Sequence, residues 1–194
     1  MARAVAPEAR ALTGSRVAEG AGRIYLVGFM GSGKTTAGRL LAERLGVPFV
    51  DLDLVFEGMA GRTIREAFEV HGEPWFRARE AELLHGTASL PSAVIALGGG
   101  TFTFPENIAF VKAHGRSIFL DVPFPVLAER LAEKAADRPL FRSEETARVL
   151  WEARLGSYKM ADRILDVTPD MTAAEVADRL VAFVQPAPPA AGTA

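Results

Sequence analysis

A short run of the sequence combines the residue types that bind polyphosphates. Residues 28–35 read Gly-Phe-Met-Gly-Ser-Gly-Lys-Thr and match the phosphate-binding loop pattern G-x-x-x-x-G-K-[ST]. Glycines allow successive backbone N–H groups to turn toward phosphate oxygens. Lys34 can reach the β- and γ-phosphates of a nucleotide, and the Thr35 hydroxyl can bind Mg²⁺. The run predicts ATP binding by Gly31, Ser32, Gly33, Lys34, Thr35 and Thr36.

Two carboxylates follow the second apolar stretch. Asp51 and Asp53 stand two residues apart, so in an extended strand they point the same way. One can orient Mg²⁺ or its waters, and the other can accept a hydrogen bond from an attacking hydroxyl. The alternative is that one of them only caps the following helix. Beside a phosphate loop we favour the functional interpretation, with Asp51 supporting Mg²⁺ through water.

Arg77 offers a planar fork that suits a carboxylate, and Glu80 lies three residues further along the same predicted helix. A pair at this spacing is more commonly a surface salt bridge of little energetic value. Arg154 could be a second carboxylate clamp, and we expect Tyr158, on the same helix face, to serve in packing.

Two further segments lie where a ligand could approach. The triplet Gly98, Gly99 and Gly100 follows a buried stretch and either lets a ligand approach the backbone closely or forms a tight turn. Arg138 lies in a charged segment between two predicted helices, where it either closes over ATP or belongs to an ordinary exposed loop.

Short apolar stretches alternate with amphipathic ones, which indicates a parallel sheet covered by helices on both faces. Ligands bind such sheets at the carboxyl ends of the strands, where the loop, the aspartates and the glycine triplet all fall. The predicted strands are 23–27, 48–51, 93–97, 117–121 and 163–167. The predicted helices are 34–45, 63–71, 74–85, 105–113, 124–134, 143–155 and 172–184.

Composition sets wider limits on the class of protein. The chain has 194 residues, a net charge of −2 and no cysteine, which excludes disulfides and thiolate chemistry and fits a reducing compartment such as the cytoplasm. The balance of charge gives no case for a nucleic-acid or membrane partner. We expect one domain over 22–184, a disordered leader over 1–21 and a disordered Pro/Ala tail over 185–194.

Taken in order, these motifs resemble those of the shikimate kinase family. The resemblance rests on 28–36, 49–53, Gly72-Glu73-x-x-Phe76-Arg77-x-x-Glu80, 98–100, Arg138-Pro139-Leu140 and Arg154-x-x-x-Tyr158. It implies a nucleoside-monophosphate-kinase-like P-loop fold with a five-stranded parallel sheet of order 2-3-1-4-5 and a mobile lid. It also implies ATP-dependent, Mg²⁺-dependent phosphorylation of shikimate.

The resemblance assigns roles to individual residues. Lys34, Asp53 and Arg138 would be catalytic, with Asp53 accepting the proton of the attacking hydroxyl and Arg138 reaching ATP from the lid. Thr35 would bind Mg²⁺ directly. Shikimate would be bound by Asp53, Arg77, Gly98, Gly99, Gly100 and Arg154.

Other functions remain open at this point. Gluconate kinases and nucleotide kinases share the loop and the fold, and a nucleotide-dependent switch is an alternative from another class. The sequence has no Asn-Lys-x-Asp guanine-recognition pattern, which disfavours a GTPase switch. No leucine heptad suggests assembly, so we expect a monomer.

Overall fold

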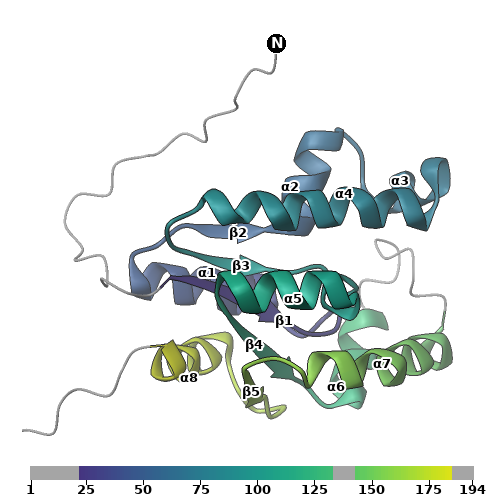
Figure 1. Cartoon of the computed structure of the whole chain (residues 1–194). Coiled ribbons are helices and arrows are strands. Elements are labelled where there is room, and N and C mark those ends of the chain that lie inside the picture. The colour runs from purple at the N-terminus through teal and green to yellow at the C-terminus, as the bar shows by residue number, and fades with distance from the viewer. Residues whose placement is uncertain (1–21, 133–142, 185–194) are drawn as a thin grey trace, which may run out of the picture.

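The computed structural model describes residues 22–132 and 143–184, so the predicted lid residue Arg138 lies outside the described residues. Five parallel strands form one sheet of order β2-β3-β1-β4-β5 (Figure 1), which confirms the predicted order. The strands are β1 (Arg23–Val27), β2 (Phe49–Asp51), β3 (Ala93–Ala96), β4 (Arg116–Asp121) and β5 (Arg163–Asp166).

Helices cover both faces of the sheet (Figure 1). Helices α1 and α8 pack together, and α1 also contacts β1, β2 and β3. On the opposite face α5 packs against β4 and α4 contacts α5. The helices are α1 (Lys34–Leu45), α2 (Leu52–Ala60), α3 (Ile64–His71), α4 (Glu73–Gly86), α5 (Pro105–His114), α6 (Phe124–Ala132), α7 (Glu144–Tyr158) and α8 (Ala173–Val184), with short 3-10 turns η1 (Thr87–Ser89) and η2 (Thr101–Thr103).

Helix α2 is absent from the elements predicted from the sequence. Asp51 ends β2 and also caps α2, because its side chain accepts hydrogen bonds from the backbone N–H groups of Asp53 and Leu54. Asp53 therefore lies in the first turn of a helix, and the prediction that it alternates along a strand with Asp51 is wrong. The chain turns from strand to helix within one residue, and a side-chain cap makes this possible.

Helices α2, α3 and α4 form a small aromatic cluster beside the sheet. Phe56 and Phe76 meet edge to face with ring centroids 4.9 Å apart, and both pack with the fully buried Ala67. A capping box between Thr63 and Glu66 begins α3 and fixes where this helix starts. The cluster anchors α4, the helix that carries Arg77.

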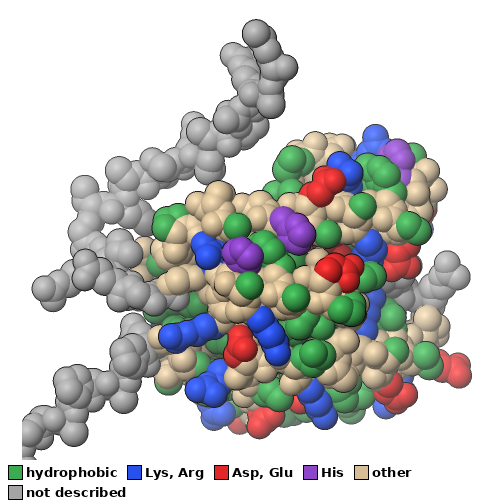
Figure 2. Space-filling model, in the orientation of Figure 1, with side chains coloured by type: hydrophobic (Ala, Val, Ile, Leu, Met, Phe, Trp, Pro, Cys, Tyr) green, Lys and Arg blue, Asp and Glu red, His purple; other side chains and the backbone are tan. Residues whose placement is uncertain are grey.

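The outer surface carries mixed charge. Acidic and basic side chains are interspersed over the face shown in Figure 2. In the part of the chain that the structure describes, no helix has the length and apolarity needed to cross a membrane.

Candidate active site

The phosphate loop runs from the end of β1 into α1, as the sequence predicts. Gly31 and Gly33 have φ angles of 83° and 90°, which favour glycine because a side chain strains this conformation. The Lys34 ammonium donates hydrogen bonds to the carbonyls of Gly28 (2.8 Å) and Phe29 (3.0 Å). The Lys34 side chain therefore contacts its own loop. It lies at the N-terminus of α1, where the helix dipole favours an anion.

Thr35 and Asp51 are joined by a direct hydrogen bond. The Thr35 hydroxyl donates to Asp51 Oδ2 at 2.6 Å, while Asp51 Oδ1 accepts from the backbone of α2. Asp51 therefore caps α2, as one interpretation predicts, and also contacts the loop, while its role toward Mg²⁺ stays a prediction. A hydroxyl and a carboxylate are hard oxygen donors of the kind that Mg²⁺ prefers, so these residues fit the ion.

Asp53 holds its proton more tightly than an ordinary aspartate. Its pKa is raised from 3.8 to about 6, mainly by burial and then by the nearby negative charges of Glu80 and Asp51, while Lys34 opposes the rise. A carboxylate with a pKa near neutrality can act as a general base. This residue is the strongest candidate for accepting a proton at the site.

The Arg77–Glu80 pair is buried, so the alternative of a surface salt bridge is wrong. Arg77 Nη1 donates to Glu80 Oε2 at 2.9 Å, and the two side chains are only 12% and 4% exposed. The guanidinium also donates from Nε and Nη2 to Glu73 Oε1. Sequence reasoning named Glu73 in a motif but missed its contact with Arg77, although the i,i+4 spacing is a recognisable signal.

The glycine triplet makes room for these charged side chains. A Cβ atom at Gly98 would lie 2.3 Å from Glu80 Oε1, and one at Gly100 would lie 2.7 Å from the Arg77 guanidinium. Gly99 accepts hydrogen bonds at its carbonyl from Arg154 Nη1 (3.1 Å) and from the Tyr158 hydroxyl. The triplet therefore leaves space for side chains of the protein itself, and close approach of a ligand stays a prediction.

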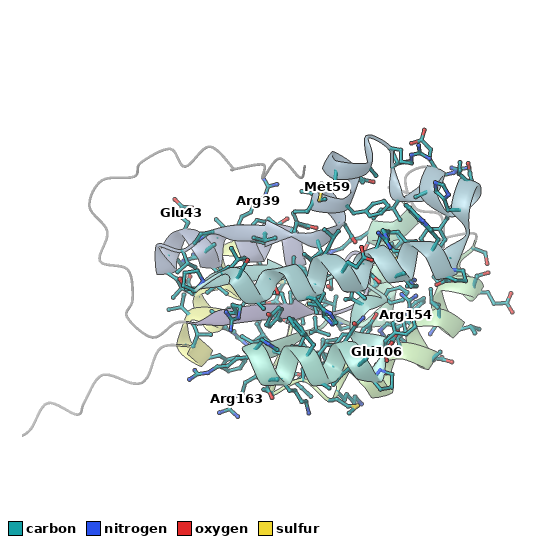
Figure 3. The ribbon with its side chains drawn as sticks, turned by 45° about the horizontal axis from the view of Figure 1, so that its top comes forward. Arg39, Glu43, Met59, Glu106, Arg154 and Arg163 are labelled. Atoms are coloured by element: carbon teal, nitrogen blue, oxygen red, sulfur yellow. The ribbon has the colours of Figure 1, made fainter. Side chains whose placement is uncertain are left out.

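Arg154 and Tyr158 extend from α7 into the interior. Arg154 is 8% exposed and lies inward in Figure 3, whereas the labelled Arg39, Glu43 and Arg163 project from the surface. Tyr158 is fully buried, as expected for packing. Its hydroxyl contact with Gly99 is an additional role that sequence reasoning missed.

One cavity of about 400 Å³ extends from the phosphate loop to Asp53 and Gly99. Its wall includes the predicted residues Gly31 to Thr36, Asp51, Asp53 and Gly99. The predicted residues Gly98, Gly100, Arg77 and Arg154 do not line it. Arg77 donates a hydrogen bond to Glu80, whose charge raises the pKa of Asp53 on this wall. Arg154 donates a hydrogen bond to the carbonyl of Gly99, which also lies on the wall.

Sequence reasoning missed the other end of the cavity. Val167, Met171 and Val176 supply an apolar wall there, and Arg130 also lines the cavity. Arg130 donates from Nη1 to the Gly31 carbonyl at 3.1 Å. An apolar wall at the other end of the cavity from Asp53 suits a nucleotide base. The apolar residues at the end of β5 and the start of α8 were the available signal, because strand ends line ligand sites in such sheets.

The sheet order, the loop and the shared cavity define a P-loop kinase for a small acceptor. A family model described as shikimate kinase matches residues 30–185. The chain belongs to the shikimate kinase family.

Individual relatives agree with this assignment. A shikimate kinase from Thermosynechococcus vestitus is 44% identical over 165 residues, which cover 84% of this chain and 89% of that protein. A structure of shikimate kinase from Acinetobacter baumannii in complex with shikimate has a TM-score of 0.80 and 35% identity, covering 84% of this chain and 92% of the other. A gluconokinase from Sinorhizobium meliloti has a TM-score of 0.56 at 20% identity and 85% and 92% coverage, a likeness in fold alone.

Proposed function

We propose that this protein transfers the γ-phosphoryl group of ATP to the 3-hydroxyl of shikimate, giving ADP and shikimate 3-phosphate. The observation that carries the proposal is a cavity that both the phosphate loop and Asp53 line. A phosphoryl donor and an acceptor base must meet in one space for direct transfer. Membership of the shikimate kinase family supports shikimate as the acceptor.

In this mechanism the loop and Lys34 bind the ATP phosphates. Backbone N–H groups at the start of α1 and the Lys34 ammonium place positive charge around the transferring group. Lys34 must exchange its hydrogen bonds to the Gly28 and Phe29 carbonyls for phosphate oxygens. We assign this residue to charge stabilisation during transfer.

Asp53 orients the attacking hydroxyl and accepts its proton. Its raised pKa, about 6, leaves the carboxylate mostly ionised at neutral pH, while making it a better proton acceptor than an ordinary aspartate. The proton moves from the acceptor hydroxyl to Asp53 as the oxygen attacks the γ-phosphorus in line with the departing ADP oxygen.

The acceptor carboxylate is assigned to Arg77 and Arg154. Two guanidinium groups offer several N–H donors in fixed planes, which suits bidentate recognition of a carboxylate. Arg77 is oriented by Glu73 and Glu80, and Arg154 by the Gly99 carbonyl. Gly98, Gly99 and Gly100 border the same acceptor pocket in this proposal, and Arg138 would approach the phosphates.

Thr35 and Asp51 would hold Mg²⁺, Thr35 directly and Asp51 through water. When bound, the ion neutralises phosphate charge and orients the γ-phosphoryl group. The hydrogen bond between these two side chains supports the assignment, because it places both oxygens beside the loop. We also propose that residues 22–184 act as one catalytic domain, as a monomer in the cytoplasm and without a nucleic-acid partner.

ADP release from purified protein tests the proposal. Protein with Mg²⁺ and ATP is assayed with shikimate, with gluconate and with a set of nucleoside monophosphates. We expect strong stimulation by shikimate alone. Stimulation by gluconate or by a nucleoside monophosphate in its place would refute shikimate as the acceptor and retain the kinase class.

A further inference from the structure

Thr101 is a fully buried residue close to Asp53 and Glu80. It is 0% exposed and begins η2, immediately after the glycine triplet. Its backbone N–H donates to the Gly98 carbonyl at 3.2 Å, and its carbonyl accepts from Asn107 Nδ2 at 3.0 Å. Hydrogen bonds to its backbone N–H and carbonyl therefore hold the residue in place.

The Thr101 hydroxyl completes the hydrogen bonding of Glu80. Thr101 Oγ1 donates to Glu80 Oε1 at 2.6 Å, while Arg77 Nη1 donates to Glu80 Oε2 at 2.9 Å. Glu80 is only 4% exposed on its side chain. Loss of either donor would leave an oxygen of a buried carboxylate without a partner, which is costly, so each of these donors helps to hold Glu80 in place.

Glu80 and Asp53 lie close together at the triplet. The point that a Cβ atom of Gly98 would occupy is 2.3 Å from Glu80 Oε1, 2.8 Å from Asp53 Oδ1 and 3.0 Å from Thr101 Oγ1. The two carboxylate oxygens are therefore no more than about 5 Å apart, a range in which like charges affect each other strongly. Any group that fixes the position of Glu80 therefore affects both Arg77 and Asp53.

We propose that Thr101 is a positioning residue for the acceptor. Its hydroxyl holds the Glu80 carboxylate in one orientation, and Glu80 in turn presents the Arg77 guanidinium to the acceptor carboxylate. This inference rests on the proposed function, since it assigns Arg77 to that carboxylate. It adds a residue that touches neither substrate yet sets the affinity for one of them.

Thr101→Val tests the proposal, because valine keeps the shape of threonine and removes its hydroxyl. We expect the KM for shikimate to rise about tenfold while the KM for ATP stays unchanged, since one hydrogen bond to a buried charged group is lost. Thr101→Ser keeps a hydroxyl and should retain wild-type behaviour.

The matched control is Thr87→Val. Thr87 is also buried, at 3% exposure, and its hydroxyl donates to the Leu84 carbonyl at 2.6 Å, at the far end of α4 from Arg77. Thermal unfolding and ATP binding of both variants separate loss of folding from loss of positioning. We expect Thr87→Val to keep the wild-type KM for shikimate.

The possible failures are distinguishable. Wild-type protein without shikimate-stimulated ADP release would overturn the proposed function and this inference with it. An active wild type, together with an unchanged KM for shikimate in Thr101→Val, would overturn this inference alone. Equal rises in both KM values, or an equal shikimate effect in the Thr87 variant, would also overturn it, because the role would then be general stability.

Discussion

Replacing Asp53 by asparagine should remove turnover and at the same time stabilise the fold. The Asp53 pKa of about 6 compares with an ordinary value of 3.8, and each tenfold change in proton affinity corresponds to about 1.4 kcal/mol. Keeping Asp53 ionised therefore lowers the free energy of unfolding by up to about 3 kcal/mol. Allowing for the cost of burying an amide, we expect Asp53→Asn to raise the free energy of unfolding by about 2 kcal/mol at pH 7.5.

The sign follows from proton linkage. Because the pKa of Asp53 is higher in the folded state, wild-type stability from this group is complete below pH 3.8 and is lost as the pH rises through about 6. The advantage of Asp53→Asn should thus be nearly gone at pH 4 and constant above about pH 7. Urea unfolding at pH 4, 5.5 and 7.5 measures this difference.

Activity gives the second half of the test. The wild-type kcat/KM should fall about tenfold between pH 7 and pH 5, because only the ionised carboxylate accepts the proton. Asp53→Asn should lose about 10²- to 10⁴-fold in kcat and keep its affinity for ATP. A variant that is less stable than wild type at pH 7.5, or equally active, would refute the role of Asp53 as a buried carboxylate that accepts the proton.

Three further changes probe the surrounding groups. Arg77→Lys should raise the KM for shikimate at least about tenfold without changing that for ATP, since a point charge cannot replace the fork; equal rises would contradict this. Asp51→Asn should raise the Mg²⁺ concentration needed for half-maximal ADP release, and an unchanged magnesium titration would argue against its role. Gly98→Ala should lower stability by at least about 2 kcal/mol in urea unfolding, because its Cβ would lie 2.3 Å from Glu80 Oε1. Gly58→Ala, in a helix with open space around it, should be neutral or stabilising.

The sheet was predictable because buried parallel strands are short, apolar and flanked by helical patterns. All five predicted strands lie within a residue or so of those observed, and the predicted order is confirmed. Helix α2 was not predictable in the same way. It follows β2 with no intervening loop, and only the cap at Asp51 and the glycine at Gly61 mark its ends.

At the site, local spacing predicted what lies on one element and failed for what several elements create together. The Arg77–Glu80 pair follows from helical periodicity, and the structure confirms it. The burial of that pair, the contact of Thr101 with Glu80 and the raised pKa of Asp53 depend on α2, α4 and η2 meeting. No pattern within one segment encodes these contacts, because they arise between residues distant in the sequence.

The position of β1 at the centre of the sheet has a consequence for folding. This strand is synthesised first among the five, yet Arg23 pairs with Ala93 and Ile24 pairs with Arg116. Helix α8, which packs on α1, is the last helix described. Most of the nascent chain must therefore emerge from the ribosome before the nucleotide pocket can form. We expect slow folding set by these long-range pairings, with ATP stabilising the finished molecule rather than guiding its early steps.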